Sequence, residues 1–161
     1  MNPSTRVAST GTGAQHSAPL GRAVCLQLLA QHRIGRLLFT DAALPAASPV
    51  SYVLDGDVVL VEIAPGSPLL RTVRDRVVGF QVDEIDPATT AGWAVLGVGQ
   101  AYEVTDPRRR AVLSLHARSG QPDDRASRML CIPLQRLTGS TLGPSGAPGI
   151  GGHPASGVAS E

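Results

Sequence analysis

The spacing of hydrophobic residues changes near residue 33. Between residues 20 and 32 the apolar positions recur every three or four residues, which is the period of a helix with one buried side. These positions are Leu20, Val24, Cys25, Leu28 and Leu29. His32 lies near the end of this expected helix. Apolar and polar residues then alternate, and this pattern predicts strands over residues 34–40, 45–54 and 58–63.

Turn and cap residues mark where the next elements begin. Asp55-Gly56-Asp57 predicts a hairpin turn, because glycine adopts the positive φ that a tight turn needs. Ser67-Pro68 predicts the start of a short helix, with serine as the N-cap and proline at the first helical position. Asp106-Pro107 repeats this signal and predicts a helix that continues through Leu115.

Three further strands are expected over residues 78–82, 93–105 and 129–137, and Pro133 places the last of them at an edge or a bulge. One face of the strand 93–105 carries Trp93, Val95, Gly97, Gly99 and Ala101. Its small residues would let another backbone or a flat ligand approach closely. Six strands joined mostly by hairpins, with short helices at the connections, predict a mainly β fold, a six-stranded antiparallel barrel with helical caps.

Both ends of the chain have a different composition from its middle. Residues 1–18 and 140–161 consist mainly of Gly, Ser, Thr, Pro and Ala, which cannot bury enough surface to offset the entropy of ordering. We therefore expect a disordered N-terminal tail over 1–18, one folded domain over 19–139, and a disordered C-terminal tail over 140–161.

Charge and composition exclude several classes of function. The 14 basic residues are all arginines and face 13 acidic residues, a net charge of +1, so a broad basic surface for nucleic acid or an anionic membrane is not expected. The absence of lysine excludes Schiff-base chemistry and the P-loop lysine. No apolar run is long enough to span a membrane, and residues 1–18 lack the apolar core of a secretory signal. We expect a cytoplasmic protein.

Few residues suggest a catalytic or metal site. Cys25 and Cys131 are interpreted as small buried hydrophobic residues, and the four histidines as solvated or helix-capping residues. The acidic group Asp83, Glu84 and Asp86 is more typical of a solvated turn than of a divalent-metal site. Gly66-Ser67, at a helix start directly after a strand, fits either an anion site or an ordinary capped helix.

The order of several short motifs resembles a known family. These motifs are His32-Arg33-Ile34-Gly35-Arg36-Leu37, Pro49-Val50-Ser51-Tyr52-Val53-Leu54-Asp55-Gly56-Asp57, Ala64-Pro65-Gly66-Ser67, Val82-Asp83-Glu84-Ile85-Asp86, Gly92-Trp93 and Thr105-Asp106-Pro107. Together, over residues 22–139, they resemble the pyridoxamine 5′-phosphate oxidase-like family of FMN-binding split barrels, in particular its small actinobacterial members. The resemblance implies a split β-barrel homodimer that holds a flavin at the subunit interface.

The resemblance also assigns the candidate binding residues. Pro49, Val50, Ser51 and Tyr52 would line the isoalloxazine ring of FMN or of a deazaflavin. Glu62, Ile63, Gly66 and Ser67 would approach the ribityl phosphate, and Trp93 would border the pocket. No catalytic residue and no metal ligand is assigned, although Tyr52 is the best available acid or base.

Three positions depart from the family pattern: Ser51 stands where Asn is usual, and the two others remove basic residues. Val61-Glu62-Ile63 replaces an aromatic-Arg-Thr sequence, and Pro68-Leu69 stands where Lys or Arg commonly follows Gly-Ser. Only Arg71 and Arg74 could replace the missing basic residues. We therefore expect weak or absent FMN binding.

Two functions fit these observations. The first is a flavin- or deazaflavin-dependent oxidoreductase acting on a small molecule. The alternative is a catalytically silent split-barrel dimer that has lost its phosphate-binding residues and acts as a binding module. In both cases the face of Trp93, Val95, Gly97 and Gly99 is expected to be covered by a second copy of the chain, because it is too flat and apolar to face water.

Overall fold

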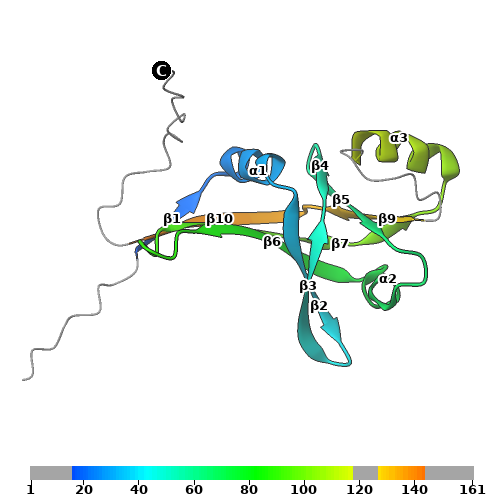
Figure 1. The fold of residues 1–161 in the computed structure, drawn as a ribbon, viewed down its shortest axis with the longest axis horizontal. Coiled ribbons are helices and arrows are strands. Elements are labelled where there is room, and N and C mark those ends of the chain that lie inside the picture. Colours follow the sequence, from blue (N-terminus) through cyan, green and yellow to red (C-terminus); the bar gives the residue numbers. More distant parts are fainter. Residues whose placement is uncertain (1–15, 118–126, 144–161) are drawn as a thin grey trace, which may run out of the picture.

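The computed structural model describes residues 16–117 and 127–143, which form three helices and ten strands (Figure 1). The helices are α1 (Arg22–Gln31), α2 (Pro68–Val73) and α3 (Pro107–Ala117). The strands are β1 (His16–Leu20), β2 (Ile34–Asp41), β3 (Leu44–Ser51), β4 (Val53–Asp55), β5 (Val58–Ile63), β6 (Val77–Ile85), β7 (Gly92–Gln100), β8 (Tyr102–Val104), β9 (Arg128–Pro133) and β10 (Arg136–Gly143).

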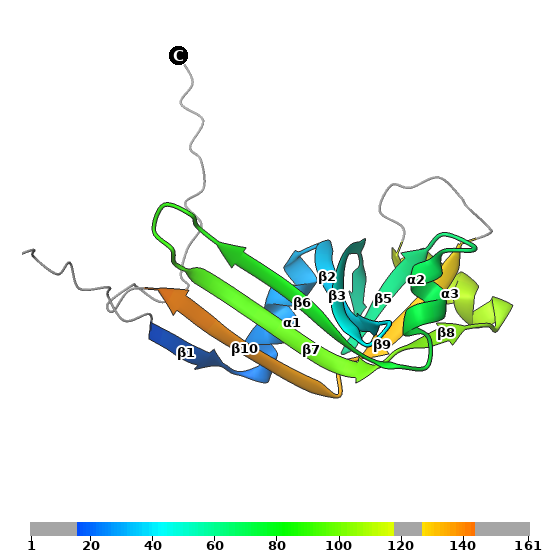
Figure 2. The same cartoon turned by 90° about the horizontal axis from the view of Figure 1, so that it is seen from below.

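The strands form two antiparallel sheets of unequal size. The larger sheet has the order β1-β10-β7-β6-β2-β3, and the smaller has the order β4-β5-β9-β8. In Figure 2 the long strands β10, β7 and β6 lie side by side with α1 behind them, and in Figure 1 the β2–β3 hairpin projects away from the rest of the molecule. The two edge strands of the larger sheet both contain proline, Pro19 in β1 and Pro45 and Pro49 in β3.

Three corners join the two sheets into a split barrel. Besides the connection from β5 to β6 through α2, the chain passes from one sheet to the other at Tyr52, at Ala101 and at Leu134, and all three side chains are buried. Each corner amide leaves the strand ladder and donates to a carbonyl elsewhere: Tyr52 to Arg33 at 2.9 Å, Ala101 to Arg76 at 2.8 Å and Leu134 to Asp57 at 2.8 Å. The bends therefore leave no buried amide of these three residues unpaired.

The corners explain why six strands were expected and ten are observed. The three longest expected strands, 45–54, 93–105 and 129–137, each continue through one corner and are divided there into two. The tenth strand, β1, was not anticipated. Pro133 lies at the corner that ends β9, in agreement with the expected bulge or edge position.

The expected helices are confirmed. Cys25, Leu28 and Leu29 of α1 are buried, and α2 begins at Pro68. Two members of the expected apolar stripe were wrong, because Leu20 belongs to β1 and Val24 is exposed. Asp106 caps α3, because its carboxylate accepts the Arg108 amide at 2.9 Å. Both cysteines are free and buried, as interpreted from the sequence. Among the described residues, no helix is long and apolar enough to cross a membrane.

The folded domain extends further than the composition indicated. β1 begins at His16 and pairs with β10, which continues to Gly143, so residues 16–18 and 140–143 belong to the larger sheet. Small and polar residues form these strands because backbone hydrogen bonds to a neighbouring strand supply the order that side-chain burial does not. The remaining parts of the expected tails, 1–15 and 144–161, lie outside the described residues.

The face that carries Trp93 and Val95 lies inside the barrel, so the expectation that a second chain covers it is wrong. A Cβ atom on Gly99 would lie 1.8 Å from the Pro133 carbonyl oxygen, and one on Gly97 would lie 2.3 Å from a Leu134 methyl carbon. The glycines thus accommodate the chain's own β9–β10 corner. The opposite face of β7, with Leu96 and Val98, points outward.

Candidate functional site

The candidate ring-binding residues follow one strand, β3, into a corner. Pro49 and Ser51 are exposed and Val50 between them is half-buried, because successive side chains of a strand point to opposite faces. Pro49 is paired with Arg36 of β2. A small cavity of about 240 Å³ opens here, lined by Ile34, Gly35, Arg36, Pro49, Val82 and Asp83.

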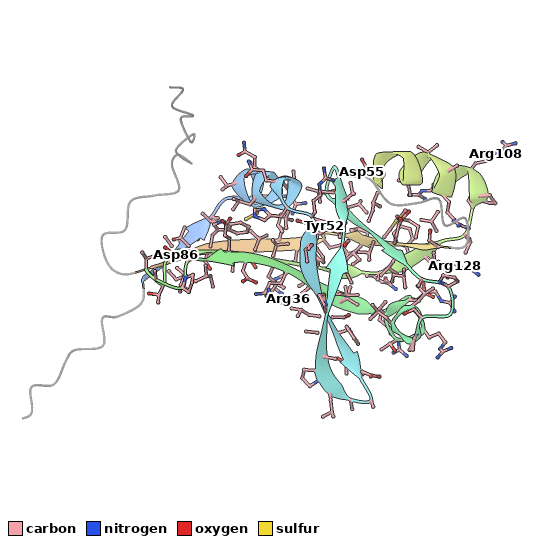
Figure 3. All side chains as sticks on the ribbon, in the orientation of Figure 1. Arg36, Tyr52, Asp55, Asp86, Arg108 and Arg128 are labelled. Carbon is pink, nitrogen blue, oxygen red and sulfur yellow. The ribbon has the colours of Figure 1, made fainter. Side chains whose placement is uncertain are left out.

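Tyr52 lies deeper than the resemblance implied. Its side chain is buried, its hydroxyl donates to the Leu29 carbonyl at 2.6 Å, and its ring makes an edge contact with Phe80 at 4.7 Å. Figure 3 shows Tyr52 in the interior between the two sheets. Burial raises the pKa of Tyr52 to about 12, with the nearby charge of Arg33 opposing the shift. The side chain holds α1 against the barrel, and it is neither a surface for a ligand nor a source of protons near neutral pH.

Trp93 is also part of the core. Its side chain is only 5% exposed, and its ring makes an edge contact with His32 at 5.0 Å. His32 bonds the Leu28 carbonyl through Nδ1 at 2.8 Å and lies 3.4 Å from Glu84 through Nε2. His32 therefore caps the end of α1, as interpreted from the sequence, and Trp93 does not border an open pocket in this protomer.

The expected phosphate-binding residues lie at the end of β5 and in the turn before α2. Glu62 is exposed, and Ile63 is buried on the opposite face of the strand. Gly66 adopts a positive φ of 77° and a Cβ there would meet nothing, so the backbone is open at this turn. The Ser67 amide donates to Ala64, and the Ser67 side chain makes no cap bond. The sequence left open whether this turn is an anion site or an ordinary capped helix. The structure shows no side-chain cap at Ser67, and an open backbone at Gly66 beside the exposed carboxylate of Glu62.

The two arginines that could restore positive charge have different surroundings. Arg74 contacts Glu103 at 3.1 Å and Asp75 at 3.8 Å, and its guanidinium is therefore already engaged. Arg71 is exposed and points into a cavity of about 520 Å³ between the β2–β3 hairpin and α2. Arg71 therefore lines a different cavity from the one beside Pro49, and neither Pro49 nor Ser51 lines the cavity of Arg71.

The acidic residues of β6 make separate contacts. Asp83 pairs with Arg36 and accepts a bond from Gln81, whereas Glu84 faces His32. The carboxylate of Asp86 accepts the Ala88 amide and the Thr89 hydroxyl, and these bonds lower its pKa. Within residues 16–117 and 127–143, no group of three or more His, Cys, Asp or Glu side chains is placed to hold a metal ion.

Sequence reasoning did not single out the Arg36–Asp83 pair or Arg76. The sequence does indicate that both side chains point outward, because Arg36 and Asp83 occupy polar positions in strands where polar and apolar residues alternate. Their proximity depends on the β2–β6 register, which pairs Arg36 with Gln81 and which no local pattern specifies.

Two antiparallel sheets joined at three corners, with a projecting hairpin and α1 on one face, define a split β-barrel of the FMN-binding type. The chain belongs to the pyridoxamine 5′-phosphate oxidase family, whose model matches residues 21–141. This confirms the resemblance inferred from the motifs over residues 22–139.

Relatives of known sequence or structure agree with this assignment. An uncharacterized protein of Mycobacterium tuberculosis is 39% identical over 116 residues, which cover 69% of this chain and 76% of that protein. The FAD binding protein from Mycobacterium smegmatis has a TM-score of 0.71 at 22% identity, over 78% of this chain and 98% of that one. The FAD and heme binding protein from the same organism has a TM-score of 0.62 at 14% identity, over 91% and 93%. The two structures share the fold of this chain.

Proposed function

We propose that the protein binds a flavin, FMN or a deazaflavin, as a homodimer and acts as an oxidoreductase on a small molecule. The observation that carries the proposal is the exposed end of β3, where Pro49 and Ser51 face outward near the cavity of about 240 Å³. The family to which the chain belongs, pyridoxamine 5′-phosphate oxidase, supports it. The names of the two mycobacterial structures, which bind FAD, support the same class of cofactor. When bound, the flavin would supply the hydride chemistry.

The outer face of the larger sheet supports the homodimer. The register aligns Leu38, Gly79 and Val98 across three neighbouring strands, and Gln81 beside Leu96 in the next row. Apart from Gln81 these residues are apolar or lack a side chain, and the face also carries the Arg36–Asp83 ion pair. A sheet face of this kind is suited to pack against an identical face, which would place Pro49 and Ser51 at the boundary of two protomers.

The residues fit the ring of a flavin better than its phosphate. The exposed strand end offers a flat backbone, whereas the Gly66–Ser67 turn has no basic side chain and lies next to Glu62. Tyr52 cannot transfer a proton because its hydroxyl is bonded to Leu29. This chain's contribution is therefore to bind and orient the flavin and to exclude water from one of its faces. A cytoplasmic location is part of the proposal and is supported by the two free thiols, Cys25 and Cys131.

Absorbance and titration test the proposal. The purified protein is expected to show flavin bands or to quench the fluorescence of added riboflavin, FMN or deazaflavin. A charge-assisted hydrogen bond contributes about 1.5–3 kcal/mol, so two missing partners should weaken FMN binding by roughly two to four orders of magnitude. The double variant Glu62→Arg with Pro68→Lys should then bind FMN at least about 100-fold more tightly.

The other outcomes distinguish the second candidate function. A protein that takes up neither riboflavin, FMN nor deazaflavin would contradict flavin binding and favour the catalytically silent dimer, a binding module. The lack of basic residues at Pro68 and Leu69 is the observation that favours this candidate. Tight FMN binding that the double variant leaves unchanged would mean that the phosphate lies away from Gly66 and Ser67.

A further inference from the structure

A second cavity lies apart from the exposed end of β3. It has a volume of about 520 Å³ and is lined by Phe39, Thr40, Asp41, Ala42, Ala43, Arg71, Thr72, Arg76 and Val77. These residues belong to the tip of the β2–β3 hairpin, to the outer side of α2 and to the start of β6. The cavity exists because β2 pairs with β6 only over Arg36–Leu38 and then diverges from it. Its volume is within the range of small-molecule sites, about 300–1,000 Å³.

Two arginines line this cavity and make no ion pair among the described residues. In the described part of the chain, no ion pair or side-chain hydrogen bond involves Arg71 or Arg76. Other arginines of the same region are paired: Arg36 with Asp83, and both Arg74 and Arg128 with Glu103. Arg71 and Arg76 reach the cavity from opposite ends of one short segment, α2 and the turn after it.

The remaining polar groups of the cavity fit an anion. The Thr72 hydroxyl lies on the wall and donates to the Pro68 carbonyl, and Thr40 is exposed on the opposite wall. Asp41 is the one carboxylate among the lining residues and works against an anion, so two positive charges face one negative charge. Arginine presents several N–H donors in a planar fork that matches the oxygens of a phosphate group.

We propose that the cleft between the β2–β3 hairpin and α2 binds a phosphate group, with Arg71 and Arg76 as its charged partners. This site does not depend on flavin binding, because it is defined by the hairpin, α2 and β6 alone. Two sources of phosphate are compatible with it. One is the phosphate of FMN, which lacks basic partners at Gly66 and Ser67; the other is a separate phosphorylated small molecule.

Inorganic phosphate is the probe for this site. We would titrate it into the full-length protein at constant ionic strength, with chloride as the reference anion, and follow the backbone amide NMR signals of Ala42, Ala43 and Thr72. Phosphate is expected to shift these signals and chloride is not. Arg71→Gln with Arg76→Gln should weaken phosphate binding at least tenfold. Arg108→Gln, which removes one positive charge from an exposed position on α3, should leave it unchanged.

Asp41→Asn is a second test, in which the expected result is a gain of phosphate binding that a misfolded variant would not show. It removes the opposing carboxylate and is expected to tighten phosphate binding several-fold. Equal effects of phosphate and chloride, or equal phosphate affinity in the Arg71/Arg76 double variant and in Arg108→Gln, would overturn the proposal. If FMN displaces phosphate and riboflavin does not, the flavin phosphate is the source. If phosphate binds equally well in saturating FMN, the source is a separate ligand.

Discussion

Tyr52 shows how one residue can match a binding motif and still serve the core. It follows Pro49, Val50 and Ser51 in the motif, but it falls at the corner between β3 and β4, where the strand turns inward. Its hydroxyl then meets the last turn of α1 rather than solvent. Under the proposed function, Tyr52 therefore supports the fold, and the chemistry would come from the flavin and from residues on the surface.

Removing this hydroxyl tests its structural role. Tyr52→Phe keeps the ring against Phe80 and is expected to lower the free energy of unfolding by about 1 kcal/mol, the usual contribution of one hydrogen bond. Urea unfolding at pH 7 measures this difference.

The same variant has a distinct pH dependence. The folded-state pKa of Tyr52, about 12, lies above its ordinary value of 10.0, so the stabilisation is complete below pH 10 and is lost as the pH rises to 12. The wild type should lose stability over this interval more steeply than Tyr52→Phe. Parallel stability curves of the two proteins between pH 10 and 12 would show that the hydroxyl is not buried.

Glycines on the two faces of β6 and β7 should respond differently to substitution. Gly99→Ala places a methyl group 1.8 Å from the Pro133 carbonyl oxygen, a rigid backbone atom, and is expected to destabilise the protein by about 3 kcal/mol or more. Gly79→Ala, on the outer face, meets the side chains of Leu38 at 3.2 Å and Leu96 at 3.5 Å and should cost less than about 1 kcal/mol. Thermal unfolding of the two variants compares them directly, and equal losses would mean that the β9–β10 corner adapts.

At the scale of elements, Glu103 links three segments. Its side chain is only 6% exposed, and its carboxylate lies 3.1 Å from both Arg74, at the end of α2, and Arg128, at the start of β9. Figure 3 shows Arg128 at the same end of the molecule as α3. Such a shared carboxylate fixes the end of the smaller sheet.

Glu103→Gln should weaken that end of the barrel. It removes the charge from two hydrogen bonds and is expected to lower the free energy of unfolding by about 2 kcal/mol. Asp57→Asn is the matched control, since Asp57 pairs with Arg22 at 3.1 Å on an exposed surface and should contribute less than about 1 kcal/mol. Denaturant titration of both variants measures the difference, and a larger loss in Asp57→Asn would contradict this ranking.

The N-terminal strand β1 should contribute to stability, whereas composition alone predicts that residues 1–18 form a disordered tail whose loss changes little. Deletion of residues 1–18 removes three of the five residues of β1 and their pairing with β10, so the melting temperature should fall by several degrees. Deletion of residues 1–15 leaves β1 intact and serves as the control. Equal melting temperatures of the two truncations would mean that the β1–β10 pairing adds nothing.

Helices, strands and turns could be predicted from the sequence where a local residue pattern specifies them. Elements that form only by pairing with a strand far away in the sequence could not. Alternation, the Asp55-Gly56-Asp57 turn and the Ser67-Pro68 helix start are local, and all three are confirmed. β1 is stabilised by a strand more than a hundred residues away, and its Ser-Ala-Pro sequence carries no sign of it. The candidate site was predictable only in part, because burial of Tyr52 and Trp93 depends on corners that interrupt otherwise continuous strands.

At the scale of the whole molecule, the outer sheet face should govern self-association. We expect the protein to sediment as a dimer at micromolar concentration. Leu96→Arg, near the centre of this face, should shift the equilibrium toward monomer by at least tenfold in dissociation constant, because it buries an unpaired charge. Val112→Arg is the control, since Val112 lies on α3 away from this face and is 54% exposed. A monomeric wild type would contradict the proposed dimer.

The prolines of β1 and β3 have a consequence for how copies of the chain can meet. A strand that adds to a sheet edge needs a regular row of amide donors, and proline supplies none. Pro19 interrupts this row on one edge of the larger sheet, and Pro45 and Pro49 interrupt it on the other. Open-ended growth, in which each chain extends the strand ladder of the one before, is therefore disfavoured at both edges of the larger sheet, as the proposed homodimer by packing of sheet faces requires.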